Sequence, residues 1–440
     1  MSFEWRAVSL GQCAELDLGY PFKSADYTDS EDGTRLLRGD NISQGQLRWD
    51  GVRRWLRGED DKLATYELRE NDLVLAMDRP WITAGLKFAR VRISDLPSLL
   101  VQRVARLRPK EGVDADYLHS VIASADFTQH IQTITTGTAV PHISGKQIQE
   151  YKFNLPDMAT QRAIGSLLIG LDDRITLLRE TNATLEAIAQ ALFKSWFVDF
   201  DPVRAKMQGR VPEGMDEATA ALFPDALVES ELGLVPKGWG VQSFRETIQI
   251  IGGGTPKTSN PDFWGGDIPW FSMVDAPAIS DVFVVDTEKH ITQAGLDGSS
   301  TKLLPTGTTI ISARGTVGRL ALTGCPMSMK QSCYGLRGLA GDSYFTYFST
   351  KRLVEQFKQR AHGSVFDTIT QESFSGVLVC FPSKDAIAAF EDCVESLMLR
   401  IRENLIQAQT LATLRDTLLP RLISGALRLP ELQAHIEEVV

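Results

Sequence analysis

The chain has 440 residues, of which 43% are hydrophobic and 23% charged, and its formal net charge is −10. This composition is typical of a soluble globular protein and the length suits two or three domains, because single cores rarely grow beyond about 300 residues. It excludes a membrane span, since no stretch reaches the roughly 18 apolar residues that a bilayer-crossing helix needs. Acidic residues concentrate in 199–237 and 384–440, whereas 238–383 is neutral. Any nucleic-acid binding must therefore rely on local patches.

The cysteines give no sign of a disulfide framework or a metal cage. There are five of them, an odd number, and no two are separated by only two residues. The first residues, Met1–Trp5, lack the basic and then apolar pattern of a signal peptide. We therefore expect a cytoplasmic protein whose cysteines are reduced, with no metal site.

An internal repeat with a constant offset organises the chain. Residues 136–157 resemble residues 362–383, so that Pro156 matches Pro382 at a shift of 226 residues, and the match continues without a gap into the following helical segments. Two unrelated domains that both end in a helix are the alternative. An ungapped match over about 60 residues favours a repeat instead.

Each half is predicted to be an irregular strand-rich domain with one clear helix. Short β-branched runs alternate with Gly, Pro, Asn and Asp, and the hydrophobic runs 73–76 and 309–312 each lead into a glycine-containing turn. The helices are expected at about 114–132 and 343–360. These features predict the α+β class.

After each half the hydrophobic period changes to that of a coiled coil. From Ile164 to Trp196 the apolar positions advance in alternating steps of four and three, with one interruption at Asn182. The same seam recurs 226 residues later and is interrupted at Asn404, among other positions. A heptad seam sustained over four repeats predicts two long spacer helices.

Two repeats, each a globular domain followed by a helix, place their domains at opposite ends of the helix pair only if the helices are antiparallel. The result is a pseudo-two-fold repeat. We predict that Asn182 and Asn404 face each other and fix the register, because a slip would leave their amides opposite leucines. Trp196 then faces Phe390, and Arg415 occupies the one poorly matched layer, from which its guanidinium must reach solvent.

The predicted architecture is therefore two tandem strand-rich domains separated by two long antiparallel coiled-coil helices. The connector is rich in Pro, Gly and acidic residues and is expected to form a surface crossover with one short helix near 216–222. The predicted segments are a first domain (1–157), a central helix (158–200), the connector (201–237), a second domain (238–383), a C-terminal helix (384–425) and a tail (426–440).

Four segments carry a resemblance to a known family, the specificity subunits of Type I restriction–modification enzymes. Gly252–Trp270 and Ile311–Arg319 resemble parts of its target recognition domains, and Ser195–Pro202 and Leu414–Gly425 resemble the ends of its helices. The resemblance implies a sequence-specific DNA-binding subunit that reads a bipartite site in double-stranded DNA. It also implies docking of two adenine-methyltransferase subunits and of restriction/translocase subunits. The first half departs from the pattern at Met77–Gly85.

Motifs for independent catalysis are incomplete. Asn260–Phe263 resembles the adenine-holding element of methyltransferases but lacks its second proline, and no F-x-G-x-G cofactor loop precedes it. The run Gly252–Gly254 belongs to no G-x-x-x-x-G-K-[ST] motif of a nucleotide-binding P-loop, and these glycines are expected to form a turn. We therefore expect no enzyme activity and no cofactor. A coiled-coil protein-interaction scaffold without DNA readout remains the alternative.

Candidate base and phosphate contacts are polar residues in glycine-flanked loops, since Arg pairs with guanine, Asn or Gln with adenine, and Lys, Ser and Thr mainly with phosphates. An ordinary solvated loop residue is the alternative for each. The candidates are Arg38, Asn41, Arg79, Gln102 and Thr138 in the first half, and Thr255, Lys257, Arg314, Lys330, Gln331 and Ser364 in the second. The candidates for partner docking are large apolar residues near the helix ends, namely Trp196, Phe197, Leu418 and Leu422. A position in the core seam of the helix pair is the alternative for Trp196.

Overall fold

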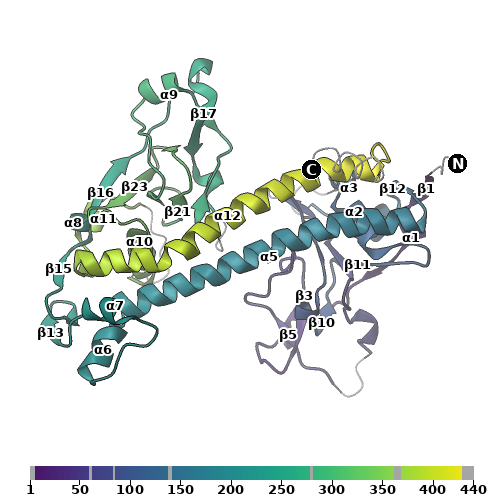
Figure 1. Ribbon diagram of the computed structural model, residues 1–440. Helices are drawn as coiled ribbons and strands as arrows, with labels where there is room; N and C mark the ends of the chain where they lie inside the picture. The colour runs from purple at the N-terminus through teal and green to yellow at the C-terminus, as the bar shows by residue number, and fades with distance from the viewer. Residues whose placement is uncertain are drawn as a thin grey trace. The chain divides into compact units, whose positions relative to one another are not determined.

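The protein consists of two compact units, each built from segments distant in the sequence. One unit comprises Met1–Arg174 and Leu411–Val440, and the other comprises Ile175–Thr410. Each unit therefore contains one strand-rich domain and part of each of two long helices (Figure 1). The computed structural model describes residues 5–58, 62–82, 85–136, 141–277, 281–360 and 368–428.

The two long helices are the same length and begin with equivalent caps. Both α5 (Met158–Phe197) and α12 (Lys384–Ile423) have 40 residues. Asp157 accepts a hydrogen bond at Oδ1 from the backbone N–H of Thr160 (3.0 Å), and Ser383 Oγ accepts one from the N–H of Ala386 (3.3 Å). Each cap satisfies a free N–H group in the first turn. Both helices thus begin at the residues expected from the repeat.

Within Ile175–Thr410 the two helices pack antiparallel around a buried amide pair. Asn404 Nδ2 donates to Asn182 Oδ1 at 2.9 Å, and Asn182 Nδ2 donates to the backbone carbonyl of Ile401 at 3.0 Å. Both asparagines are buried. Trp196 and Phe390 meet edge to face, with ring centroids 5.9 Å apart. The predicted contacts in these two layers are therefore present.

In the other unit, Arg415 reaches an acidic partner instead of only solvent. Its Nη1 lies 2.5 Å from Asp172 Oδ1 on α5, and its Nη2 lies 2.7 Å from Asp416 on its own helix. Hydrogen bonds to Asp172 and Asp416 raise the pKa of Arg415 against the opposing effect of burial. The poorly matched layer is thus stabilised by a half-buried ion pair.

The first strand-rich domain is built on a five-stranded and a three-stranded sheet. The five-stranded sheet has the order β2 (Ala14–Leu18), β11 (Val104–Pro109), β6 (Leu73–Ala76), β9 (Phe88–Arg90), β4 (Gln44–Gly45). The three-stranded sheet has the order β10 (Ser98–Leu100), β3 (Thr34–Leu37), β5 (Arg54–Trp55). Two smaller pairs are β1 (Arg6–Ser9) with β12 (Lys152–Leu155) and β7 (Trp81–Ile82) with β8 (Gly85–Leu86). The central strand β6 is buried along its whole length, as its continuous apolar run requires.

The helix predicted at 114–132 is two helices, α2 (Ala115–Ala123) and α3 (Ala125–Ile134). Ser124 ends the first in an extended conformation, and its Oγ accepts a hydrogen bond from the N–H of Phe127 to cap the second. The hydrophobic pattern continues across this break, so periodicity alone missed it. The remaining helices of the domain are α1 (Leu10–Cys13), α4 (Gly145–Gln149) and the 3-10 turns η1 (Ser24–Asp26), η2 (Ala64–Tyr66) and η3 (Ile93–Asp95).

The second strand-rich domain repeats the same sheets. Its five-stranded order is β16 (Ile248–Gly252), β23 (Cys333–Gly338), β20 (Thr309–Ser312), β21 (Leu320–Thr323), β18 (Phe283–Val284). Its three-stranded order is β19 (His290–Ile291), β17 (Trp264–Phe271), β22 (Ser328–Met329), and β15 (Gly240–Ser243) pairs with β24 (Leu378–Phe381). The helical elements are α8 (Phe244–Thr247), α9 (Gln293–Asp297), α10 (Tyr344–Arg360), α11 (Gln371–Ser375), η4 (Pro261–Phe263) and η5 (Met273–Asp275).

Strand directions and registers match between the two domains. The edge pairs β4–β9 and β18–β21 are both parallel, as are β3–β10 and β17–β22. Ala105 of β11 lies opposite Leu18, and its counterpart Tyr334 of β23 lies opposite Gly252. The internal repeat therefore extends through the whole strand-rich domain, well beyond the segment in which the sequence match is visible.

The connector 201–237 contains more structure than expected. The expected short helix is α7 (Glu217–Ala221), capped by Asp216, but α6 (Asp201–Met207) and a hairpin of β13 (Leu227–Ser230) and β14 (Gly233–Pro236) accompany it. The high content of Pro and Gly concealed these short elements.

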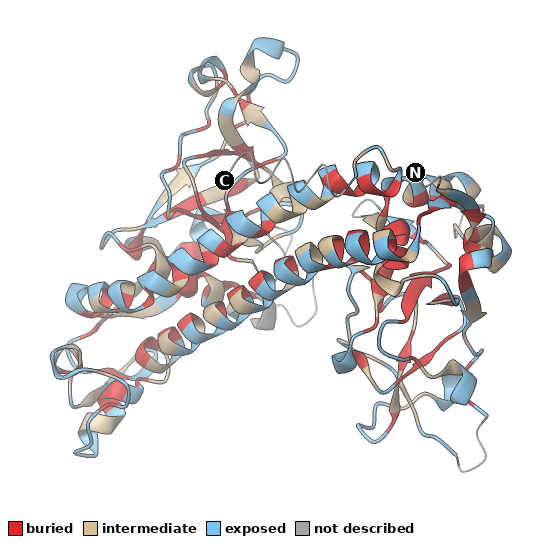
Figure 2. Ribbon diagram, turned by 45° about the vertical axis from the view of Figure 1, so that its right-hand side comes forward, coloured by how far each residue is buried: buried red, intermediate tan, exposed pale blue. Residues whose placement is uncertain are grey.

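The four side chains proposed for partner docking lie in the hydrophobic cores. Trp196 and Phe197 pack among aromatic side chains that include Phe390 and Trp239, and Leu418 and Leu422 are buried in the core of the other unit. Figure 2 shows buried residues recurring at intervals along both long helices. A partner could contact these four residues only by opening a core, so we withdraw them as docking residues.

A partly buried ion pair attaches the second domain to its helix. Lys351 of α10 donates to Glu186 Oε1 (2.7 Å) and Gln190 Oε1 (2.9 Å) of α5. In the first domain Gln161 of α5 accepts the N–H of Asp114 at 2.9 Å. Side-chain contacts of this kind hold each domain on the helix pair.

The asparagine pair yields a first prediction. Asn182→Leu should lower the free energy of unfolding by about 1–3 kcal/mol, because it leaves the buried amide of Asn404 without an acceptor. Adding Asn404→Leu removes that amide, so the double variant should recover most of the loss. Thermal unfolding of both single variants and the double variant measures this coupling. Simple addition of the two single effects would contradict it.

Candidate functional site

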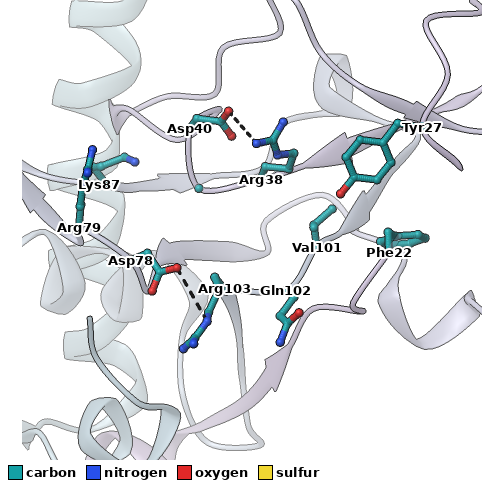
Figure 3. A pocket seen from close by; sticks show the side chains of 11 residues that line it. Phe22, Tyr27, Arg38, Asp40, Asp78, Arg79, Lys87, Val101, Gln102 and Arg103 are labelled. Carbon is teal, nitrogen blue, oxygen red and sulfur yellow. Dashed lines mark ion pairs between the residues drawn. The ribbon is translucent and has the colours of Figure 1, made fainter. Parts of the chain in front are cut away.

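A pocket of about 680 Å³ opens in the first domain near the ends of several strands (Figure 3). Strands β3, β6 and β10 each end beside it, so residues distant in the sequence meet there. Its lining consists of residues 38–40 after β3, 78–79 after β6, 101–103 between β10 and β11, Lys87 before β9, and the aromatic residues Phe22 and Tyr27. The arrangement combines charged groups with aromatic walls.

Two exposed ion pairs line this pocket. Arg38 Nη2 lies 3.3 Å from Asp40 Oδ2, and Arg103 Nε lies 3.8 Å from Asp78 Oδ2, as the dashed lines in Figure 3 mark. Exposed pairs of this kind contribute little to stability, about 0–1 kcal/mol. Both guanidinium groups can therefore exchange their carboxylate for another anion at small cost.

Two further cations, Arg79 and Lys87, lie together at one side of the pocket (Figure 3). Arg79 has a φ of 46°, an unusual conformation for a residue with a side chain, and its N–H donates to the carbonyl of Pro141 at 2.6 Å. Burial lowers the pKa of Lys87, against the opposing effect of Asp40. Four cationic side chains against two carboxylates make the pocket attractive to anions.

The structure brings three of the five first-half candidates together. Arg38, Arg79 and Gln102 all line the pocket. Asn41 does not: it is buried, its Oδ1 accepts from the N–H of Arg38 (3.0 Å), and its Nδ2 donates to the carbonyl of Arg48 (3.0 Å). Its amide shapes the loop that carries Arg38, and we remove it from the candidate contacts. Thr138 lies outside the described residues.

In the second domain, Arg314, Lys330 and Gln331 lie at the same end of adjacent strands. The N–H of Ala313, which follows β20, donates to the carbonyl of Ser332 at 2.8 Å, so Arg314 is next to the turn that contains Lys330 and Gln331. All three candidate side chains are exposed. This end of the sheet corresponds to the pocket end of the first domain.

The other second-half candidates are more scattered. The side-chain oxygen of Thr255 is buried and has no hydrogen-bond partner among the residues that the structure describes. Lys257 has an exposed side chain, and its backbone carbonyl accepts a hydrogen bond from Trp264 Nε1 at 3.4 Å. Ser364 lies outside the described ranges.

Both domains hold their candidate glutamine in the same four-residue turn. Val104 donates its N–H to the carbonyl of Val101 (3.1 Å), and Cys333 donates to that of Lys330 (3.0 Å). The glutamine follows the first residue of each turn. The first residue of each turn is held in the same way. The N–H of Val101 donates to the carbonyl of Leu37 at the end of β3, and the N–H of Lys330 donates to the carbonyl of Phe271 at the end of β17.

A glycine packs directly beneath each of these turns. A Cβ atom on Gly19 would lie 2.1 Å from the carbonyl oxygen of Val101, and a Cβ on Gly253 would lie 2.1 Å from that of Lys330. Such distances leave no room for any side chain. Gly253 therefore has a packing role within the Gly252–Gly254 run, which the sequence indicated only as a turn.

Sequence reasoning missed two cations of the pocket, Lys87 and Arg103. Arg103 directly follows a candidate glutamine in an exposed turn, which was a usable signal. Lys87 precedes the short strand β9, and only the pairing of β9 with β6 brings it next to the residues that follow β6.

Cysteine thiols, a buried histidine and possible metal ligands are the next groups to consider. Burial raises the pKa of Cys333 and of Cys380 to about 11, so both remain protonated thiols. Burial lowers the pKa of His119 to about 4. No cluster of His, Cys, Asp and Glu in the described part of the chain has the arrangement of a metal site. Among the described helices, none combines the length and apolarity needed to cross a bilayer.

Comparisons with known proteins are consistent among themselves. The family model described as the Type I restriction modification DNA specificity domain matches residues 3–187 and 236–405. The chain is 31% identical over 357 residues to the Type I restriction enzyme HindI specificity subunit of Haemophilus influenzae, covering 70% of this chain and 77% of that protein. It is 23% identical to the MjaIX specificity subunit of Methanocaldococcus jannaschii, covering 80% and 78%.

One solved structure has the same fold along nearly the whole chain. The S subunit of a Type I restriction-modification system from M. genitalium superposes with a TM-score of 0.54 at 14% identity, covering 96% of each chain. At this identity the similarity supports the fold alone.

The two neighbouring glycines of the second domain provide a matched test. Gly253→Ala should lower the free energy of unfolding by about 1–3 kcal/mol, because the added methyl group must displace the backbone of Lys330. Gly252→Ala should change it by less than about 0.5 kcal/mol, since nothing lies within 4 Å of its Cβ position. Thermal unfolding compares the two. Equal melting temperatures for the two variants would show that the turn at Lys330 shifts at little cost to make room for the methyl group.

Proposed function

The chain belongs to the family of Type I restriction-modification DNA specificity proteins, and we propose that it reads a two-part site in double-stranded DNA, one part with each strand-rich domain. The carrying observation is that one fold occurs twice with matching registers, while the exposed side chains at corresponding strand ends differ. A shared scaffold with different loop residues suits the reading of two different half-sites.

The chemistry of the strand ends fits contact with DNA despite the acidic chain. Arg38, Arg79 and Lys87 in the first domain, and Arg314 and Lys330 in the second, place local positive charge where the chain as a whole is negative. Arginine recognises guanine through two hydrogen bonds in the major groove, and lysine mainly contacts phosphates. Because the Arg38–Asp40 pair is exposed and weak, a DNA phosphate or base could replace the carboxylate at small cost.

We further propose that the chain has no catalysis of its own and that two adenine-methyltransferase subunits and restriction/translocase subunits assemble on it. The described residues offer no metal cluster, and the cysteines with raised pKa are unsuited to nucleophilic attack. On the long helices, Leu177, Ile188, Leu399 and Ile406 stay exposed although they are large and apolar. Exposed apolar side chains on a helix suit protein contacts, so these four replace the buried docking candidates.

Exchange of one domain tests the two-part site. Replacing residues 238–383 by the corresponding region of the Haemophilus influenzae relative should change the recognised bases in one half of the site and leave the other half intact. Mapping of methylated adenines in a genome that expresses the chimera with its methylating partners gives the result. The reciprocal exchange of 1–157 should change the other half. If either chimera altered both halves, the domains would not be independent readers.

Introduction of a charge on the helix surface tests partner docking. Ile188→Lys and Leu399→Lys each place a charge on an exposed apolar position and should reduce co-purification with the methylating subunits about tenfold or more, because a buried unpaired charge weakens an interface. Thermal stability should change little. Leu303→Lys, at an exposed leucine of the second domain, is the matched control. Unchanged assembly of both helix variants would exclude this surface as the docking site.

A further inference from the structure

The structure assigns Gln102 and Gln331 to equivalent positions, and we propose that each recognises one adenine in its own half of the DNA site. This inference rests on the proposed reading of a two-part site. Beyond that function, it specifies which residue of each domain reads a base and that the base is adenine.

The equivalence follows from the hydrogen bonds of the backbone rather than from sequence similarity. In each domain the residue before the glutamine is anchored to the neighbouring strand, with N–O distances of 3.1 Å to Leu37 and 2.9 Å to Phe271. The residue after the glutamine accepts a hydrogen bond from the end of the central strand, donated by Met77 in the first domain (2.9 Å) and by Ala313 in the second (2.8 Å). Both neighbours of each glutamine are therefore fixed by the sheet.

The glycine beneath each turn restricts it further. Gly19 and Gly253 bring the backbone so close to the turn that neither position tolerates a side chain. A side chain that projects from such a turn starts from a rigid base, which lowers the entropy lost when it binds. The positions of the two glutamines are thus prepared before DNA is bound.

The carboxamides of Gln102 and Gln331 are exposed, and neither forms a hydrogen bond to any described residue. Some other glutamines of the chain use their amides to support the fold. Gln161, for example, accepts from Asp114 and donates to the carbonyl of Pro156. A free carboxamide offers one donor and one acceptor side by side, which matches N7 and the N6 amino group of adenine in the major groove.

The residues around the glutamines differ between the domains at matching positions. Arg38 and Ser272 both donate their N–H to an Asn or Asp side chain three residues later, yet only the first domain has a cation there. Asp78 follows Met77, and Arg314 follows Ala313, whose N–H groups donate to the two glutamine turns. The first domain therefore has an acidic residue where the second has a basic one. The glutamine is the shared element, so each half-site contains one adenine in a corresponding place, with other bases selected by the variable neighbours.

The decisive experiment changes the hydrogen-bonding pattern at the glutamine. In Gln331→Arg the side chain gains the donors that match guanine O6 and N7, so one position in one half-site should change from adenine to guanine. In Gln331→Ala the same position should accept any base, with a loss of affinity of roughly tenfold to hundredfold for the original site. Gln102→Arg should produce the corresponding change in the other half. The readout is adenine-methylation mapping with the assembled complex, supported by binding competition with duplexes altered at single positions.

Gln249→Arg is the matched control, since Gln249 is an exposed glutamine on β16, away from the turn, and its replacement should leave the recognised sequence unchanged. A uniform loss of affinity in the Gln331 variants, without a change at one base, would overturn the proposal and assign the glutamine to the DNA backbone. An unaltered site would overturn it as well. If the wild-type complex recognised no defined sequence, the proposed function itself would fail, which is a separate outcome. Melting temperatures equal to that of the wild type establish that the variants fold.

Discussion

Two amides buried between α5 and α12 set the alignment of the helices in the second unit. The bonds from Asn404 to Asn182 and from Asn182 to the carbonyl of Ile401 satisfy polar groups that leucine neighbours could not satisfy. Hydrophobic side chains alone tolerate several alignments at similar energy, whereas a buried amide tolerates only the one that pairs it. The aromatic layer at Trp196 and Phe390 forms in the same alignment. Helix register therefore depends on a polar contact inside an apolar seam.

Large parts of the fold could be predicted because they obey simple periodicity. The heptad seam and the constant offset predicted both helices, and the matching interruptions at Asn182 and Asn404 predicted which side chains meet. The break at Ser124 could not be predicted from the hydrophobic pattern, because a serine that caps one helix and ends another leaves the apolar spacing intact. The hairpin in the connector was hidden by a composition that resembles a loop.

The candidate site was predictable where exposure and residue type decided it. Arg38, Arg79 and Gln102 were chosen as polar loop residues, and the sheet brings them to one pocket. Asn41 has the same sequence signature, yet its amide is used to hold a turn, and such local hydrogen bonds are not evident from residue type. The four large apolar residues at the helix ends were misjudged for the converse reason. Aromatic side chains suit a docking surface and a core equally well, and only packing decides between them.

The offset of the asparagine pair has a consequence for self-association. Because the two helices are related by a shift of 226 residues, Asn404 corresponds to Leu178 of the first helix, and not to Asn182. Two copies of the first helix paired in the same alignment would place Asn182 against Leu178 twice, and neither amide would find its partner. Two copies of the second helix in this alignment would likewise place Asn404 against Ala408, so neither asparagine would find an amide partner. Each half of the chain is therefore complementary to the other half and mismatched with itself, which disfavours self-association through two copies of the same helix.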